Sequence, residues 1–240
     1  MKHIVCFFLI ASIALTSWPA RFAAADDDGN EQKAVLITGA SSGLGRAMTE
    51  LLASKGHFVY AGARKDGDLA ELNRIENVQA VRLDVNVQED IDAAVKTITE
   101  AGRGLHGLVN NAGVAILAPL IEVDEEDFSF QMDVNVAGPY RVTRAFAPLI
   151  IESQGRITTT GSISGILSGP MFGPYSMTKH AMEAFVDSLA AEMARFDVHV
   201  SIIEPGTYQS RIGENALERM KARNQTTEDS KFQEDLDGMI

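Results

Sequence analysis

The sequence predicts an α/β fold in which helices cover both faces of a doubly wound parallel sheet. Short apolar, β-branched runs alternate along the chain with amphipathic helical patterns. A glycine-rich turn joins the first of these runs to the first helix. The length of 240 residues suits a single domain of this kind. We therefore expect right-handed crossovers and a binding site at the carboxyl ends of the strands.

The first 25 residues have the pattern of a signal peptide and not of the domain. Lys2 precedes an apolar run from Ile4 to Leu15, and the small residues Ala23 to Ala25 provide a cleavage site. The run is short for a membrane span. We expect residues 1–25 to direct export to a periplasmic or secreted location, followed by a linker over residues 26–32. An uncleaved anchor, or an apolar arm that leaves the protein cytoplasmic, is the alternative.

Charge and composition exclude several classes of partner. The net charge of −12 argues against nucleic acid and anionic membranes, which attract basic surfaces. Beyond the N-terminal segment we expect no membrane contact. The five histidines are scattered and no acidic or cysteine cluster accompanies them, so we expect no metal site. The only cysteine, Cys6, lies in the leader.

The first strand, Lys33–Thr38, leads into a turn that suits a phosphate group. Glycines let the backbone approach a pyrophosphate, whose charge the amides and the following helix N-terminus stabilise. The spacing is Thr-Gly-x-x-x-Gly-x-Gly, and a glycine-rich turn without a ligand is the alternative. The binding candidates in it are Gly39, Ser41, Ser42, Gly43, Leu44 and Gly45.

The second strand, His57–Ala61, and the third, Val78–Leu83, should end near an adenosine. A ribose 2′-hydroxyl calls for an acidic partner after the second strand, whereas a 2′-phosphate calls for a cation. Arg64 is the candidate cation. If Arg64 and Lys65 only solvate a loop, Asp66 or Asp68 would serve the hydroxyl. Asp84 and Val85 follow the third strand, where Asp84 could simply end the strand.

The middle of the chain continues the alternation. An amphipathic helix over Gln88–Glu100 precedes a fourth strand, Leu105–Val109. The strand leads into Asn110-Asn111-Ala112-Gly113. A helical pattern then runs from Asp127 to about Glu152, contains Asn135, and is expected to bend at Gly138-Pro139.

A hydroxyl, a phenol and an ammonium occur together after the fifth strand, Ile157–Thr160. Ser162 follows that strand, and Tyr175 and Lys179 stand four apart on a helix expected to reach Arg195. This spacing places both side chains on one helix face. Since a phenol titrates near ~10, we expect the nearby ammonium to lower the pKa of Tyr175. Along this helix we expect three methionines to fill the core, namely Met177, Met182 and Met193.

The sixth strand, Val198–Ile203, is followed by Pro205-Gly206 and by a tail without strand pattern. We expect a lid helix over Asn215–Lys221 and a mobile polar tail. Residues 33–212 would then form the domain, with an incomplete substrate lid and tail over residues 213–240. The sixth strand would be left as an apolar sheet edge.

Four motifs, in order, resemble those of the short-chain dehydrogenase/reductase family over roughly residues 33–212. They are Thr-Gly-x-x-x-Gly-x-Gly, Asp84-Val85, Asn-Asn-Ala-Gly, and Ser162 with Tyr175-x-x-x-Lys179. The resemblance implies a Rossmann-like doubly wound sheet that lacks its last strand. It also implies a nicotinamide-dependent oxidoreductase that interconverts a carbonyl and a secondary alcohol. The catalytic residues carried over from the family are Asn135, Ser162, Tyr175 and Lys179.

The resemblance further implies how a cofactor is held. NADP is favoured because Ala63 stands where an NAD enzyme usually carries Asp and Arg64 follows. NAD stays open because Ser42 replaces a second basic residue in the glycine loop. Tyr175 and Lys179 would also contact the cofactor. The remaining cofactor residues are Asp84, Val85, Asn111, Ala112, Gly113, Pro205, Gly206, Thr207 and Ser210.

The partners implied are a small carbonyl or alcohol substrate and further copies of the chain, in a homodimer or homotetramer. The apolar segment Gly165–Phe172 should line the pocket and favours a lipophilic substrate. A nucleotide-binding protein without turnover, or a dimerising module, is the alternative function.

Overall fold

The computed structural model describes residues 32–206, 212–222 and 230–238. Strands and helices alternate there as the sequence predicts. None of the helices within these ranges has the length and apolar character needed to cross a membrane. The elements are β1 (Ala34–Ile37), α1 (Gly43–Ser54), β2 (Phe58–Ala63), α2 (Asp66–Leu72), β3 (Val78–Arg82), α3 (Gln88–Glu100), β4 (Gly107–Asn110), α4 (Glu125–Met132), η1 (Asp133–Ala137), α5 (Gly138–Glu152), β5 (Arg156–Thr160), η2 (Ile163–Gly165), α6 (Gly173–Met193), η3 (Ala194–Phe196), β6 (His199–Ile203), α7 (Ile212–Ala222) and α8 (Gln233–Asp237).

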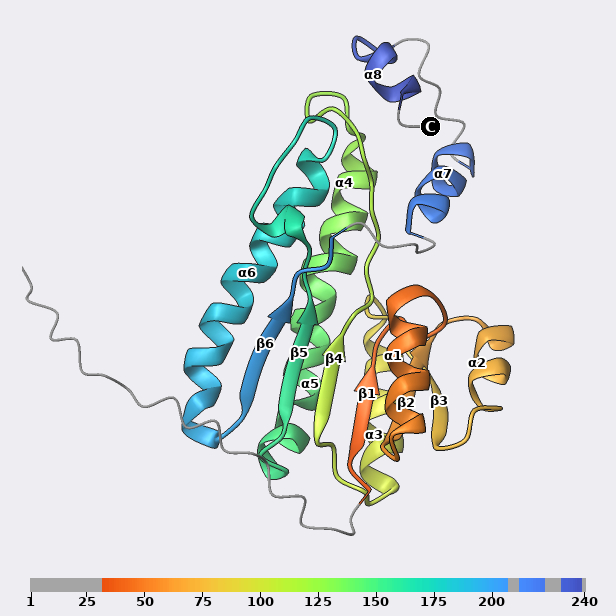
Figure 1. The fold of residues 1–240 in the computed structure, drawn as a ribbon, viewed down its shortest axis with the longest axis vertical. Coiled ribbons are helices and arrows are strands. Elements are labelled where there is room, and N and C mark those ends of the chain that lie inside the picture. The colour runs from red at the N-terminus through yellow and green to blue at the C-terminus, as the bar shows by residue number, and fades with distance from the viewer. Residues whose placement is uncertain (1–31, 207–211, 223–229, 239–240) are drawn as a thin grey trace, which may run out of the picture. The chain divides into compact units, whose positions relative to one another are not determined.

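Six parallel strands form one sheet in the order β3-β2-β1-β4-β5-β6 (Figure 1). The central strand β1 pairs with β2 on one side and β4 on the other, so that Leu36 lies opposite both Tyr60 and Leu108. This is the expected Rossmann-like doubly wound topology. The strand order reverses at β1 and β4, and their carboxyl ends therefore form the crevice in which such folds bind ligands.

Each face of the sheet has its own apolar core, because successive strand residues point to opposite faces. Leu36 and Leu108 pack in one cluster with Ile91 of α3 and Phe146 of α5. Ile37 packs in a second cluster on α1. Figure 1 shows α1 in front of the sheet and α3 behind it. The two clusters fix the register of the strands and hence the positions of the loops at their carboxyl ends.

Three local predictions differ from the structure. β2 continues two residues beyond Ala61, because Gly62 and Ala63 pair with β3. The single helix expected from Asp127 to Glu152 is divided into α4, the π-helical segment η1 and α5. Met177 is 47% exposed, so its assignment to the core is wrong, whereas Met182 and Met193 are buried.

β6 pairs with β5 alone among the strands within the described ranges, and no seventh strand occurs there. Its residues alternate between exposed and half-buried, and Ile203 at its end is exposed. The expected sheet edge is thus present in this part of the chain.

Described residues after β6 contact the body of the domain, and the mobility expected of the tail stays a prediction. The helix expected over Asn215–Lys221 is present as α7, and its Arg219 Nη2 lies 2.7 Å from Asp127 Oδ1 on α4. Ahead of α8, the Ser230 hydroxyl donates to Glu122 Oε2 at 2.6 Å. The backbone N–H of Lys231 donates to Glu122 Oε1 at 3.1 Å.

Candidate active site

Ser162 and Tyr175 come from two adjoining elements at the carboxyl end of β5. Ser162 is the N-cap of η2, and its Oγ accepts the backbone N–H of Ser164 at 3.1 Å. Tyr175 lies in the first turn of α6, where Pro174 suits the helix start because its missing N–H would have no partner. The Ser162 hydroxyl hydrogen-bonds with the Tyr175 phenol. Both are largely removed from water.

Lys179 completes the arrangement from the next turn of α6. Its Nζ donates to the backbone carbonyl of Thr160, the last residue of β5, at 2.9 Å. The same Nζ lies 5.5 Å from the centroid of the Tyr175 ring. Lys179 is only 7% exposed. The structure therefore brings the predicted hydroxyl, phenol and ammonium into one buried group.

The pKa shift of Tyr175 differs from the one that the sequence predicts. Burial raises the pKa of Tyr175, and the Ser162 hydrogen bond opposes that rise only in part. The net shift is opposite to the expected lowering by Lys179. Burial also lowers the pKa of Lys179 to about 8, against the attraction of Glu183. Desolvation penalises each charged form, and here it outweighs the Ser162 hydrogen bond at Tyr175 and the attraction of Glu183 at Lys179. Tyr175 consequently stays protonated at neutral pH.

Glu183 is a residue of the site that the sequence analysis missed. It follows Lys179 by four positions on α6, a helical spacing that could have identified it. Burial, followed by the neighbouring Glu204, raises the pKa of its carboxyl. A Cβ added at Gly165 would lie 2.6 Å from Glu183 Oε1, so the side chain lies against η2. Glu183 thus places a carboxyl near the Lys179 ammonium.

Asn135 lies in η1 and joins three parts of the site. Its Oδ1 accepts the Val114 N–H at 2.8 Å, and its Nδ2 donates to the Val114 carbonyl at 2.8 Å. Nδ2 also lies 3.1 Å from Thr178 Oγ1, the hydroxyl next to Lys179 in sequence. A π-helical turn is wider than an α-helical one and often marks a functional site. Asn135 therefore contacts α6 through Thr178.

The glycine turn is too tight for side chains, and a turn without side chains lets its backbone approach a phosphate. A Cβ at Gly45 would stand 2.2 Å from the Gly39 carbonyl oxygen and 2.5 Å from Asn111 Nδ2. Gly39 and Gly43 have φ of 64° and 54°, which favour glycine. Ser42 makes no capping side-chain bond, and the first turn of α1 contains no acidic residue. The turn, with Ser41 and Leu44 half-buried within it, therefore suits the pyrophosphate of a dinucleotide.

The asparagine motif closes the crevice between β1 and β4. Thr38 Oγ1 accepts the backbone N–H groups of Asn111 at 2.9 Å and Ala112 at 3.0 Å. Asn111 Nδ2 donates to the carbonyl of Thr38 at 3.0 Å. A Cβ at Gly113 would lie 3.4 Å from Asn135 Oδ1, so the motif reaches the catalytic group. Thr38, the first residue of the glycine motif, is a second residue that the sequence analysis did not assign.

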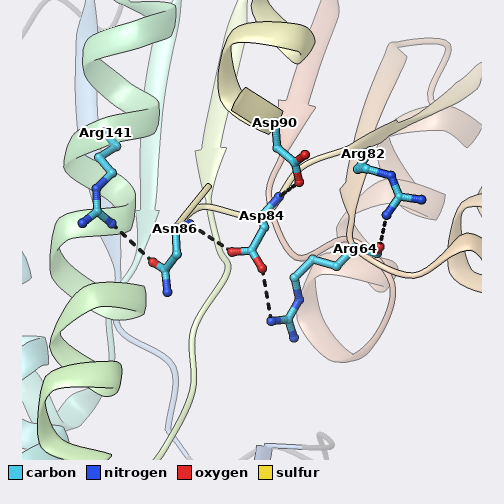
Figure 2. Close-up of polar contacts among 6 residues, drawn as sticks. All are labelled: Arg64, Arg82, Asp84, Asn86, Asp90 and Arg141. Carbon is cyan, nitrogen blue, oxygen red and sulfur yellow. Dashed lines mark hydrogen bonds and ion pairs between the residues drawn. The ribbon is translucent and has the colours of Figure 1, made fainter. Parts of the chain in front are cut away.

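Arg64 and Asp84 meet at the carboxyl ends of β2 and β3 (Figure 2). Arg64 Nη1 lies 3.6 Å from Asp84 Oδ2. Asp84 Oδ1 accepts the Asn86 N–H at 2.9 Å, and the N–H of Asp84 donates to Asp90 Oδ2 at 3.0 Å. The side chain of Val85 is buried in the core, so only its backbone is suited to a ligand. The predicted adenosine residues therefore lie together.

Asp66 and Asp68, the alternative partners for the ribose hydroxyl, both lie on α2. Asp66 pairs with Arg82, and it begins α2 at the same edge of the sheet. Asp68 lies in the first turn of α2.

At the other end of the site, the Pro205 carbonyl accepts the Ile163 N–H at 3.1 Å, so Pro205 and Gly206 lie beside η2. Thr207 and Ser210 lie outside the described residues.

Exposed apolar side chains lie on segments next to Ser162 and Tyr175 and on the loop after β4. The Ala118 N–H donates to the Met171 carbonyl at 2.9 Å, which joins the loop after β4 to the loop after η2. A Cβ at Gly173 would meet the Leu120 side chain at 2.5 Å. Large apolar side chains on these two loops and on η2 are exposed to solvent, namely Leu120, Ile121, Ile163, Ile166, Leu167 and Phe172.

Comparison with known families and proteins agrees with this geometry. The family model described as short chain dehydrogenase matches residues 33–221. The mitochondrial D-beta-hydroxybutyrate dehydrogenase of Mus musculus is 33% identical over 225 residues, covering 87% of this chain and 66% of that protein. The rat protein of the same name is covered over 60% of its length. The chain thus spans less than two thirds of these relatives.

Two solved structures resemble the fold. A short-chain dehydrogenase/reductase from Burkholderia phymatum, in complex with NAD, has a TM-score of 0.74 and 30% identity. The match covers 82% of this chain and 73% of that one. A short-chain dehydrogenase from Burkholderia cenocepacia, in complex with NADP, has a TM-score of 0.70 and 29% identity, covering 77% and 76% of the two chains.

Proposed function

Because this chain belongs to the short-chain dehydrogenase family, we propose that it is a nicotinamide-dependent oxidoreductase that interconverts a carbonyl and a secondary alcohol. The observation that carries the proposal is the group of Ser162, Tyr175 and Lys179, in which Ser162 and Lys179 are buried and Tyr175 is half-buried, beside a glycine turn suited to a dinucleotide. A protein that only bound nucleotide would have no need for a buried ammonium beside a phenol.

The mechanism assigns one role to each side chain. In the reductive direction the bound nicotinamide supplies the hydride. Tyr175, held protonated by burial, gives its hydroxyl proton to the substrate oxygen. Ser162 Oγ already accepts the Ser164 N–H, which leaves its own O–H to donate to the same oxygen as charge develops there.

Lys179 and Asn135 act on the proton that Tyr175 loses. The Lys179 ammonium stabilises the phenolate left after transfer. Its pKa of about 8 lets it exchange a proton near neutral pH. Asn135 holds the chain after β4 against α6 through Val114 and Thr178, and in the proposed relay it links Lys179 to solvent.

A cofactor titration followed by a carbonyl screen tests this function. NADPH and NADH are titrated by fluorescence, and carbonyl compounds are screened with the tighter cofactor. In Tyr175→Phe, turnover should fall by ~10² or more with little change in cofactor affinity. Tyr140→Phe, at an exposed position on α5, is the matched control and should keep full activity. Unaltered turnover in Tyr175→Phe would refute the mechanism; binding without turnover on any carbonyl would favour a nucleotide-binding protein.

NADP is the proposed cofactor, with NAD as the alternative. Support comes from Ala63, which ends β2 without a carboxylate, and from the Arg64 guanidinium at the same edge. A 2′-phosphate would give this cation a dianionic partner. Arg64→Leu should weaken NADPH binding more than NADH binding, and an equal loss for both would leave Arg64 as a solvated loop residue.

The proposed substrate is lipophilic. The exposed apolar side chains of the two loops around Ser162 and Tyr175 would gain from contact with an apolar group. Lengthening the alkyl chain of a ketone series should raise kcat/KM by about threefold or more per methylene, given roughly 0.8 kcal/mol for each buried CH₂. A flat or falling series would oppose this proposal.

We also propose that residues 1–25 direct export and that the protein forms a homodimer or homotetramer. The N-terminal pattern Lys2, Ile4–Leu15 and Ala23–Ala25 supports export. Cell fractionation with N-terminal sequencing tests it, since an uncleaved cytosolic product would refute it. Light scattering of the purified protein tests assembly, and a monomer at micromolar concentration would refute the oligomer.

A further inference from the structure

The backbone of Arg64 has a fixed attachment. Arg82 Nη1 donates to the backbone carbonyl of Arg64 at 2.6 Å, and the other arm of the Arg82 guanidinium pairs with Asp66 (Figure 2). Arg82 thereby connects β3 to the turn between β2 and α2. The backbone of Arg64 is held at the sheet edge while its guanidinium extends toward Asp84.

Asp84 is fixed as well. Its N–H donates to Asp90, its Oδ1 accepts from Asn86, and its carbonyl accepts the Val87 N–H at 3.0 Å. Asn86 Oδ1 in turn lies 3.3 Å from Arg141 Nη1 on α5, as Figure 2 shows. These bonds leave Oδ2 as the carboxylate oxygen directed at Arg64.

The ion pair between Arg64 and Asp84 is weak enough for Arg64 to leave it for another anionic partner. Its length of 3.6 Å exceeds that of a charge-assisted hydrogen bond, which is roughly 2.7–2.9 Å. The Arg64 side chain is 59% exposed, against 27% for Asp84. Breaking an exposed ion pair of this kind changes a binding constant only by a small factor. Arg64 is therefore the movable member, and Asp84 is a fixed partner that it can leave.

We propose that Asp84 is a specificity-determining residue that competes with the cofactor's 2′-phosphate for the Arg64 guanidinium. This inference rests on the proposed function for the adenosine site only. With a 2′-hydroxyl in the site, Arg64 stays on Asp84 and its charge remains paired. With a 2′-phosphate, Arg64 leaves Asp84 for a partner with higher charge and bidentate geometry. The Arg64–Asp84 pair thus lowers affinity for the phosphorylated ribose and lets the chain accept both forms.

Two half-cofactors test the competition without the nicotinamide. Binding of adenosine 2′,5′-bisphosphate and of 5′-AMP is measured by calorimetry at about 0.15 M salt, where exposed charges beyond roughly 8 Å are screened. The quantity of interest is the Kd for 5′-AMP divided by the Kd for the bisphosphate. Asp84→Asn should raise this ratio by about two- to fivefold, because the amide no longer holds Arg64. Any change in adenine binding cancels in the ratio.

A double-mutant cycle separates competition for Arg64 from simple charge repulsion. In an Arg64→Leu background, Asp84→Asn should change the ratio by less than about 1.5-fold. The matched control Asp92→Asn removes one carboxylate from α3, where Asp92 accepts from Gln88 at 2.8 Å, and should leave the ratio unchanged. An equal effect of Asp84→Asn in both backgrounds would show that Asp84 acts by its charge alone, and would overturn the proposal. So would an unchanged ratio in Asp84→Asn itself.

The outcomes distinguish this inference from the proposed function. Loss of turnover in every assay, with the predicted ratios intact, would refute the oxidoreductase and support the competition. Normal turnover with an unchanged ratio would support the oxidoreductase and refute the competition. Failure of both half-cofactors and of both whole cofactors to bind would overturn the two together.

Discussion

At the scale of single residues, the site depends on the cost of burying charge. Lys179 is almost fully buried, with the Thr160 carbonyl as its hydrogen-bond acceptor and the Tyr175 ring nearby. Neither carries a negative charge, and the Glu183 carboxyl only partly offsets the desolvation. The ammonium is thus held at a free-energy cost that the rest of the fold offsets.

Lys179→Met should remove this cost and its pH dependence. The pKa of Lys179 is about 8 in the fold against 10.5 unfolded. Below pH 8 the ammonium is charged in both states, and its full penalty is present. Between these two values the unfolded chain binds more protons, so the stability of the wild type rises with pH. The rise relative to the variant should be on the order of 3 kcal/mol, at about 1.4 kcal/mol per pKa unit.

Urea unfolding of the nucleotide-free protein from pH 7 to 10.5 measures this difference. The matched control is Lys96→Met, since the Lys96 side chain is 74% exposed on α3. The difference in the free energy of unfolding between Lys96→Met and the wild type should not change with pH. A constant difference between wild type and Lys179→Met across the range would contradict the prediction.

At the scale of elements, the crevice depends on how closely α1 approaches the strand ends. Gly45 in the first turn of α1 lies against the Gly39 carbonyl and the Asn111 amide. Asn111 joins the loop after β4 to the end of β1, because its backbone N–H donates to Thr38 Oγ1 and its Nδ2 donates to the carbonyls of Thr38 and Gly39. Any side chain at Gly45 would push the helix away from the strands.

Gly45→Ala should therefore damage both stability and cofactor binding. The added Cβ would stand 2.2 Å from a backbone oxygen that has no freedom to move away. We expect a loss of about 1–3 kcal/mol in the free energy of unfolding and a tenfold or greater loss of NADPH affinity. Gly67→Ala on α2 is the control, because a Cβ there meets nothing within 4 Å. Thermal unfolding and fluorescence titration measure the two effects, and wild-type values in Gly45→Ala would contradict this account.

At the scale of the whole domain, Arg219 attaches α7 to α4. Arg219 Nε and Nη2 lie 2.8 Å and 2.7 Å from Asp127 Oδ1, and the guanidinium lies 4.0 Å from the Phe130 ring centroid. Asp127 is buried, with a side chain 2% exposed. A buried carboxylate strongly favours a cationic partner, which explains how a polar helix stays on the domain.

Arg219→Leu should release α7 while leaving the sheet intact. Cleavage by proteinase K within residues 212–222, followed by mass spectrometry, should become about tenfold faster. Glu218→Gln, at an exposed position on the same helix, should keep the wild-type rate. Equal cleavage in both variants would mean that other contacts hold α7.

The sequence by itself determined the order of the elements, the parallel sheet and the identity of Ser162, Tyr175 and Lys179, because strand patterns, glycine turns and i,i+4 spacing are local. It placed Gln88–Glu100 correctly as a helix but missed the π-helical turn at Asp133–Ala137, which has no local signal distinct from an α-helix. The tertiary structure alone decided the pairing of Arg64 with Asp84 and of Asp127 with Arg219, since these partners lie far apart in the chain. It also reversed the expected pKa shift of Tyr175. Desolvation depends on everything packed around a group, and that is fixed only when the chain has folded.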